Sequence, residues 1–365
     1  MKRMCLDWPA RLGDFFSSYG HDAVDVFIVL SGFCLALPVV RGDGFVRGGA
    51  LQFFQKRARR ILPPYFLAML FSLLLIWLAI GHKTGTHWDY SLPVNAKGIL
   101  THLLLVQDLF RDTSAKINHA FWSISVEWRI YFLFPLLVAL RRSWGSLWVA
   151  AAAVALSYAA LYVGQHTAVN AVIDLDPAGA STQYFGLFAL GMLGADIAYG
   201  TSKNGKAPLP ALRRPATAVL LLGATTLLMA AASKIKVSHG QPLGLNDTDF
   251  FVGLWAASLL IAASNEQLPW LSKALSWRPF VFIGTFAYSI YLIHGPLIQI
   301  LWQYVLFPLQ GDPLRMFCGL CLLGIPVIIG VSYLFFLACE RPFLRTRRRE
   351  TLAETERDAA LSPAP

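Results

Sequence analysis

The sequence predicts an all-α protein, a polytopic bundle of transmembrane helices with about nine spans. Composition is the first reason, because 56% of the 365 residues are hydrophobic and only 14% are charged, whereas soluble domains carry about 25% charged residues. The mean hydropathy of +0.53 fits a protein that faces lipid over much of its surface. The second reason is that the apolar residues fall in runs of roughly 17–25, the length that a membrane-crossing helix requires.

The expected spans follow from these apolar runs. They cover residues 23–40, 61–80, 120–140, 144–163, 183–199, 215–232, 249–264, 279–302 and 314–338. The stretch 99–110 is apolar but too short to cross. We expect it to form a helix that lies at the interface or packs re-entrantly.

Basic residues predict the orientation of the spans. Lys and Arg gather in alternate connections, within 41–60, 141–142, 203–214, 273–278 and 341–357. Since cytoplasmic loops are enriched in these residues, we expect those segments and the C-terminus to be cytoplasmic. The formal charge of +10 is then a topology signal, and no nucleic-acid partner is expected. Residues 1–22 would lie outside without a signal peptide, so we expect that a first, inward-starting helix is missing from the chain.

Ionisable groups within the spans are functional candidates, because such groups are costly at membrane depth. Glu127 and His294 lie roughly 10–12 Å inside the outer ends of their spans, and Asp25 lies at the outer start of span 23–40. Three helices would thus bring acids and an imidazole to the outer half of the membrane. The alternative is that each group forms a structural contact between helices.

Glu127 and Arg129 cannot satisfy each other, because helical residues two positions apart point in different directions. Each therefore needs its own partner on a neighbouring element. Ser123 and Tyr131 lie four positions either side of Glu127 and share its face, so they are placed to orient its carboxylate.

A basic cluster directly precedes the second span. Arg57 and Arg60 are three positions apart and share a helix face, and their planar guanidinium groups suit phosphate. The alternative is an ordinary cytoplasmic anchor beside lipid headgroups.

Six short motifs, in order along the chain, resemble those of the acyltransferase 3 family of bacterial integral membrane O-acyltransferases. They are VDVFIVLSGF at 24–33, RARRILPPY at 57–65, FWSISVEWRIY at 121–131, GML at 191–193, YSIYLIHGP at 288–296 and ERP at 340–342. The resemblance implies about ten spans in a complete member. The family's first helix, which carries an Arg and a catalytic His, has no counterpart here. The resemblance divides the chain into an N-terminal segment (1–22), an acyltransferase 3-like transmembrane domain (23–338) and a basic cytoplasmic tail (339–365).

The resemblance implies transfer of an acyl group, usually acetyl, from acyl-CoA to a hydroxyl of a surface glycan, a lipid-linked sugar or a similar acceptor. Acyl-CoA would be a substrate, with no permanently bound cofactor and no metal. The expected catalytic residues are Glu127, His294, Ser123, Tyr291 and Asp25, and Arg57, Arg60 and Tyr65 are expected to hold the donor. The base would be the His of the missing helix or, in its absence, His294. Ser123, Tyr291 and the Trp122 indole are the possible oxyanion donors.

Two other functions fit a membrane protein with buried ionisable groups. A secondary transporter also uses Asp, Glu and His at membrane depth, but it is expected to show paired internal repeats, and the two halves of this sequence show no convincing similarity. A non-catalytic membrane partner, descended from the family, is the other alternative.

Overall fold

The structure is a computed structural model that describes residues 8–167, 173, 182–200, 209–238, 246–264, 268–307 and 313–344. Within these ranges every regular element is a helix, which confirms the all-α prediction. The basic residues expected at 203–206 and 345–357, and most of the loop 164–181, lie outside the described residues. The described chain forms two compact units, and each is treated by itself.

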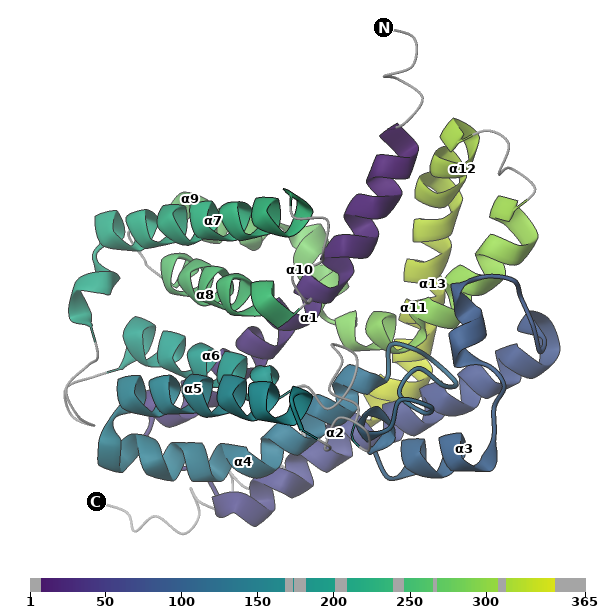
Figure 1. The fold of residues 1–365 in the computed structure, drawn as a ribbon. Helices are drawn as coiled ribbons and strands as arrows, with labels where there is room; N and C mark the ends of the chain where they lie inside the picture. The colour runs from purple at the N-terminus through teal and green to yellow at the C-terminus, as the bar shows by residue number, and fades with distance from the viewer. Residues whose placement is uncertain are drawn as a thin grey trace, which may run out of the picture. The chain divides into compact units, whose positions relative to one another are not determined.

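Unit 1 comprises the described residues of 1–50, 100–115 and 121–281. Its helices are α1 (Trp8–Arg41), η3 (Gln107–Leu109), α4 (Trp122–Trp144), α5 (Ser146–Gln165), α6 (Gln183–Tyr199), η6 (Pro210–Arg213), α7 (Pro215–Ser238), α8 (Asn246–Ala263) and α9 (Pro269–Leu275). Helix α4 packs on α5, α5 on α6, α6 on α8 and α8 on α7, while α1 crosses α6 and α8 (Figure 1).

Unit 2 comprises the described residues of 51–99, 116–120 and 282–365. It contains nearly all of α2 (Gly49–Leu75), then η1 (Ile76–Ile80), η2 (His87–Ser91), α11 (Ala287–Leu301), η7 (Trp302–Leu306), α12 (Pro313–Gly319), η9 (Leu320–Gly324), α13 (Ile325–Phe335) and η10 (Phe336–Glu340). Helices α3 (Ala96–Leu103) and α10 (Arg278–Gly284) each begin in one unit and end in the other. Among the described residues, the π turns η1, η7, η9 and η10 all belong to unit 2.

Several helices are long and apolar enough to cross a membrane, so the chain is a multi-pass membrane protein. Five pass on length and composition: Asp22–Arg41, Gly49–Ile80, Trp122–Trp144, Ser146–Gly164 and Leu314–Leu344. The bent pair Arg278–Gly284 and Ala287–Leu306 makes a sixth if it counts as one span. Helices also occupy the stretches expected at 183–199, 215–232 and 249–264, but they do not meet the length and composition of a span. The count of nine spans therefore stays a prediction.

Two helix boundaries and one bend differ from the prediction. The stretch 49–60 is helical and continues into the span, so Arg57 and Arg60 lie on α2 and not in a loop. The last apolar helix continues to Leu344, past the start expected for the tail. The span expected at 279–302 is bent by 75° between Gly284 and Ala287. In the first two cases helix-favouring residues extend the apolar segment, because polarity alone does not end a helix.

Helices α1 and α6 cross at backbone distance because both carry glycine at the crossing. A Cβ on Gly32 would lie 2.1 Å from the carbonyl oxygen of Phe188, and one on Gly191 would lie 2.0 Å from that of Val29. No side chain fits at such distances, so the glycines of two predicted family motifs set the packing of the first described helix. Small residues serve membrane helix pairs in this way generally.

Candidate functional site

Glu127 lies in unit 1, on the α4 face that meets α1. Its Oε1 accepts a hydrogen bond from Ser31 Oγ at 2.8 Å and a second from the Tyr131 hydroxyl. The two hydroxyls are themselves 3.3 Å apart. Glu127 is buried, and hydroxyl donors are the partners that a buried carboxylate requires. The prediction that Tyr131 orients Glu127 from four positions along the helix is confirmed.

Ser31, which donates to Glu127, lies at the crossing of α1 and α6. Gly32 lets α1 approach α6 at backbone distance, and Ser31 precedes it in the chain. Asp25 of α1 and Ser123 of α4 are both buried in unit 1, as their assignment to a site within the bundle requires. Their catalytic roles stay predictions.

Arg129 has the separate partner that its position on α4 predicted. Its two terminal nitrogens donate to both carboxylate oxygens of Asp108 in η3, one of them at 2.7 Å. Burial raises the pKa of Asp108, and the Arg129 guanidinium opposes that rise. This pair fixes the short segment after α3 against the middle of the predicted active-site helix.

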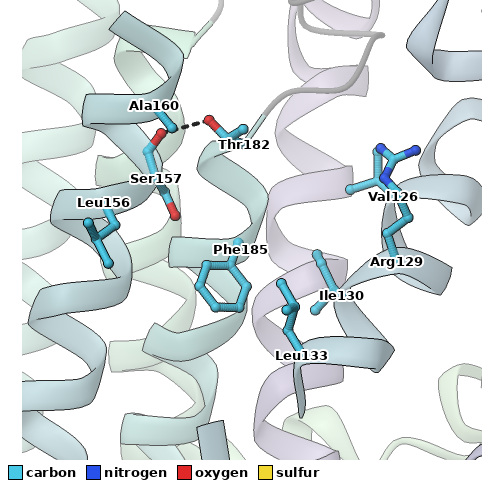
Figure 2. A pocket seen from close by; sticks show the side chains of 9 residues that line it. All are labelled: Val126, Arg129, Ile130, Leu133, Leu156, Ser157, Ala160, Thr182 and Phe185. Atoms are coloured by element: carbon cyan, nitrogen blue, oxygen red, sulfur yellow. Dashed lines mark hydrogen bonds between the residues drawn. The ribbon is translucent and has the colours of Figure 1, made fainter. Parts of the chain in front are cut away.

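An apolar pocket of about 320 Å³ lies between α4, α5 and α6 (Figure 2). Glu127 is not among the residues that line it. Apart from Arg129, Ser157 and Thr182, its walls are aliphatic or aromatic: Val126, Ile130, Leu133, Leu156, Ala160 and Phe185. Thr182 Oγ1 donates to the Ser157 carbonyl at 2.6 Å, so both residues are already engaged. The shape and the lining suit an apolar chain and not a charged reacting group.

His294 lies in unit 2, on α11. Its Nδ1 lies 2.8 Å from the carbonyl oxygen of Tyr291 and 3.2 Å from that of Ile290. Because a carbonyl oxygen can only accept, Nδ1 must carry the proton, and in the neutral ring Nε2 then holds the free lone pair. The His294 side chain is partly exposed, and Nε2 makes no hydrogen bond to any described residue. The ring is therefore held in the tautomer that a general base needs.

The short segment 116–120 holds α11 in place around His294. Asn118 Nδ2 donates to the Leu292 carbonyl at 2.9 Å and lies 3.3 Å from Ser72 Oγ of α2. The Tyr291 hydroxyl donates to the Ala120 carbonyl at 2.9 Å. Since this donation uses the single phenol proton, Tyr291 would have to exchange this bond to serve as an oxyanion donor.

The predicted donor-binding residues also belong to unit 2. Arg57 is half-buried over the Phe53 ring, with 5.7 Å between the guanidinium carbon and the ring centroid. Arg60 is exposed and within electrostatic range of Glu340. Tyr65 is completely buried, so it supports α2 from within. Their contact with a donor stays a prediction.

Hydrogen bonds connect three of the motifs within unit 2. Tyr288 of α11 donates to the Ile61 carbonyl of α2 at 3.1 Å. Ser289 donates to Glu340 Oε2 at 2.5 Å, which joins α11 to the last described helix. Since His294 is six residues beyond Tyr288, it lies about 9 Å along α11 from the contact with the basic end of α2.

The structure thus brings Glu127, Tyr131 and Ser31 together in one unit, and His294, Tyr291 and Asn118 in the other. The convergence of Glu127, Asp25 and His294 in one pocket stays a prediction. The sequence reasoning missed Ser31, Asp108 and Asn118. The Asn118–His119 pair directly before the FWSISVE motif was a usable signal for the last of these, because polar side chains are rare at the start of a span. Across the described ranges, no three His, Cys, Asp or Glu side chains are placed to hold a metal ion.

Comparison with known proteins identifies the family of this chain. The model of a family described as an acyltransferase domain matches residues 8–336. The chain belongs to this family. The recognition from six motifs is confirmed, and the two clusters above are parts of an acyltransferase domain.

Three relatives match parts of this acyltransferase domain. The putative peptidoglycan O-acetyltransferase YrhL of Bacillus subtilis is 26% identical over 296 residues, which cover 76% of this chain and 44% of the relative. The peptidoglycan O-acetyltransferase OatA of Listeria monocytogenes is 26% identical over 297 residues, which cover 77% and 45%. The acyltransferase MdmB of Streptomyces mycarofaciens is 29% identical over 154 residues, which cover 39% and 36%. The chain thus spans less than half the length of the first two, and no solved structure matches it.

Proposed function

We propose that this protein is a membrane O-acyltransferase that moves an acyl group, in the first place acetyl, from acyl-CoA to a hydroxyl of a surface glycan or lipid-linked sugar. Membership of the acyltransferase family and the peptidoglycan O-acetyltransferase names of two relatives support the reaction and the type of acceptor. The observation that carries the proposal is the His294 imidazole, whose Nδ1 is fixed by carbonyls and whose Nε2 makes no hydrogen bond to any described residue.

His294 then acts as the general base. Nε2 takes the proton of the acceptor hydroxyl while the hydroxyl oxygen attacks the thioester carbonyl. The tetrahedral intermediate collapses with loss of the coenzyme A thiolate, which receives the proton back from the imidazolium. The Nδ1 bonds to Tyr291 and Ile290 keep the ring in one orientation through both proton transfers.

The donor enters on the side of the basic end of α2 in this proposal. Arg57 and Arg60 would hold the coenzyme A phosphates, since guanidinium groups bind phosphate with paired hydrogen bonds. The protein would lie in the cell (inner) membrane with its C-terminus in the cytoplasm, where acyl-CoA is made. The acceptor would enter from the opposite side.

The test uses acetyl-CoA labelled in its acetyl group, added to membranes that contain the full chain. We expect labelled glycan or lipid to form, and Glu127→Gln to abolish that labelling while the amount of protein in the membrane stays unchanged. The replacement keeps the size of the side chain and removes its charge, so it separates a catalytic carboxylate from a structural one. Full labelling by Glu127→Gln removes this residue from the mechanism.

Two other outcomes would overturn the proposal itself. Uptake of a solute without consumption of the thioester would indicate a secondary transporter. Absence of both uptake and transfer by the native-length protein would indicate a non-catalytic membrane partner.

A further inference from the structure

The connection between η1 and α3 presents a cluster of aromatic rings in unit 2. His87, Trp88 and Tyr90 all lie in the short helix η2. The rings of His87 and Tyr90 are 5.1 Å apart, and Tyr90 remains 67% exposed. Trp88 by contrast is buried, with 2% of its surface exposed. The cluster therefore exposes the Tyr90 ring and buries the Trp88 ring.

Hydrogen bonds within the connection hold these rings in a fixed position. The Asp89 carboxylate accepts from the backbone N–H and hydroxyl of Thr84, at 2.6 and 2.8 Å, and from the Gly85 N–H at 2.9 Å. These bonds, the Thr84 backbone first, lower the pKa of Asp89. Thr86 Oγ1 accepts from the Trp88 N–H and donates to Gln299 Oε1 of α11 at 3.0 Å. The connection is thus tied to the helix that carries His294.

His119 joins this cluster to the turn of α11 at His294. Its ring centroid lies 5.2 Å from that of Trp88 and 5.6 Å from that of His87. A Cβ on Gly295 would lie 3.0 Å from Asn118 Oδ1, 3.4 Å from the Trp88 ring and 3.5 Å from His119 Cε1. The bare backbone at Gly295, next to His294, therefore packs directly against this cluster.

Two polar atoms of the cluster have no partner among the described residues. His119 Nδ1 and Trp88 Nε1 are buried and make no hydrogen bond there. Such atoms are unusual because a buried donor or acceptor that is left unpaired destabilises the fold. Burial, with the neighbouring His294 and His87, also lowers the pKa of His119 to about 4. His119 is therefore a neutral hydrogen-bonding group at physiological pH and not a cation for phosphate.

We propose that His87, Tyr90, Trp88 and His119 form the acceptor subsite and bind a pyranose ring of the acceptor glycan. This inference rests on the proposed function, because it takes His294 as the base. Aromatic faces suit the apolar C–H face of a sugar, and neutral polar groups suit its hydroxyls. The exposed His87 and Tyr90 rings contact the sugar, and the buried Trp88 ring, which contacts His119, supports them within the fold. A neighbouring hydroxyl then faces Nε2 of His294.

The kinetic test uses the full chain in membranes, labelled acetyl-CoA and soluble N-acetylglucosamine oligosaccharides as the probe acceptor. We expect Tyr90→Ala to raise the KM for the oligosaccharide about tenfold, the equivalent of one aromatic contact of about 1.4 kcal/mol. The KM for acetyl-CoA stays unchanged, and Tyr90→Phe keeps the wild-type KM because its ring is retained.

A matched control exists in unit 1. Tyr162 is 63% exposed and stacks on His166 with 4.2 Å between ring centroids, so Tyr162→Ala removes an equivalent exposed Tyr–His pair. We expect its KM for the oligosaccharide to equal that of the wild type. An unchanged KM in Tyr90→Ala, or an equal rise in Tyr162→Ala, would overturn the subsite while leaving the proposed function intact. Lower membrane insertion of Tyr90→Ala with an unchanged KM would mean that Tyr90 anchors the chain at the interface instead.

A binding measurement separates the two proposals when the wild type transfers nothing. Saturation-transfer NMR on the purified full chain in detergent, with chitotetraose as the ligand, measures binding of the oligosaccharide and does not require acyl transfer. Binding by the wild type that is lost in Tyr90→Ala supports the subsite even if the transferase proposal fails. Absence of binding by the wild type overturns the subsite.

Discussion

The Glu127 cluster and the His294 cluster of the acyltransferase domain differ in the hydrogen bonds that their reactive atoms make. Glu127 in unit 1 is buried, and its Oε1 accepts two hydroxyl bonds from Ser31 and Tyr131. His294 in unit 2 is partly exposed, and its Nε2 has no bond to any described residue. These two bonds hold the Glu127 carboxylate in one position and contribute to stability. An open imidazole nitrogen costs the fold little and is available for proton transfer.

Of the variants compared below, His294→Gln should give the largest effect. We expect His294→Gln to lower the rate of acyl transfer by about 10²- to 10⁴-fold, the range for loss of a general base. Its thermal unfolding midpoint in detergent should stay close to that of the wild type, because Nε2 makes no bond to any described residue. The measurement is the initial rate of label transfer at saturating acetyl-CoA, beside a thermal melt. A rate within a few-fold of the wild type would assign the base to another residue.

Loss of a hydroxyl beside Glu127 should give the opposite pattern. We expect Tyr131→Phe to lower the free energy of unfolding by about 1–3 kcal/mol, because a buried carboxylate loses a donor. The acyl-transfer rate should fall far less than in His294→Gln. Thermal melts in detergent measure the change.

Tyr304→Phe is a suitable control for Tyr131→Phe. The Tyr304 hydroxyl donates to the Ala79 carbonyl at an exposed position, where water can replace it. A wild-type melting temperature for Tyr131→Phe, or an equal loss in both variants, would mean that the Glu127 cluster is not a buried, stabilising group.

A pH series should give the smallest effect, through His119. Its pKa is about 4 in the folded chain and 6.5 in an unperturbed side chain. Below pH 6.5 the unfolded state therefore binds a proton that the folded state does not, and stability falls as the pH drops toward 4. Between pH 7 and 5.5 this amounts to about 1 kcal/mol. His119→Gln should show a smaller drop in melting temperature over the same interval, and identical slopes for both proteins would contradict this account.

The sequence predicted relations within single helices better than relations between them. The shared face of Glu127 and Tyr131, and the separation of Arg129 from Glu127, follow from helix geometry alone. The partners Ser31 and Asp108 lie 96 and 21 residues away in the chain, and no periodicity locates them. Motif order was enough to recognise the family. The roles of Gly32 and Gly191 became visible only once the helix crossing was known.

Helix boundaries and bends were the least predictable parts of the fold. The lengths of the apolar runs predicted where spans occur. They did not predict that the polar, basic stretch 49–60 is also helical. The proline before the break, Pro279, lies five residues upstream of Gly284, so the usual sequence signal for a kink does not mark the break itself. The neutral imidazole of His119 depends on burial by residues that are distant in the chain, so composition does not reveal it.

The π turns of unit 2 let its helices hold an extra residue without a change in the direction of the side chains that follow. A π turn holds one more residue than an α turn and is typically an insertion within a regular helix. Loss of one residue from 336–339 would restore regular winding, because four residues of an α-helix turn about as far as the five residues of η10. The Glu340 carboxylate would then keep its direction toward Ser289 on α11. Single-residue deletions within η10 should therefore be tolerated in natural variation more readily than deletions within the regular turns of α13.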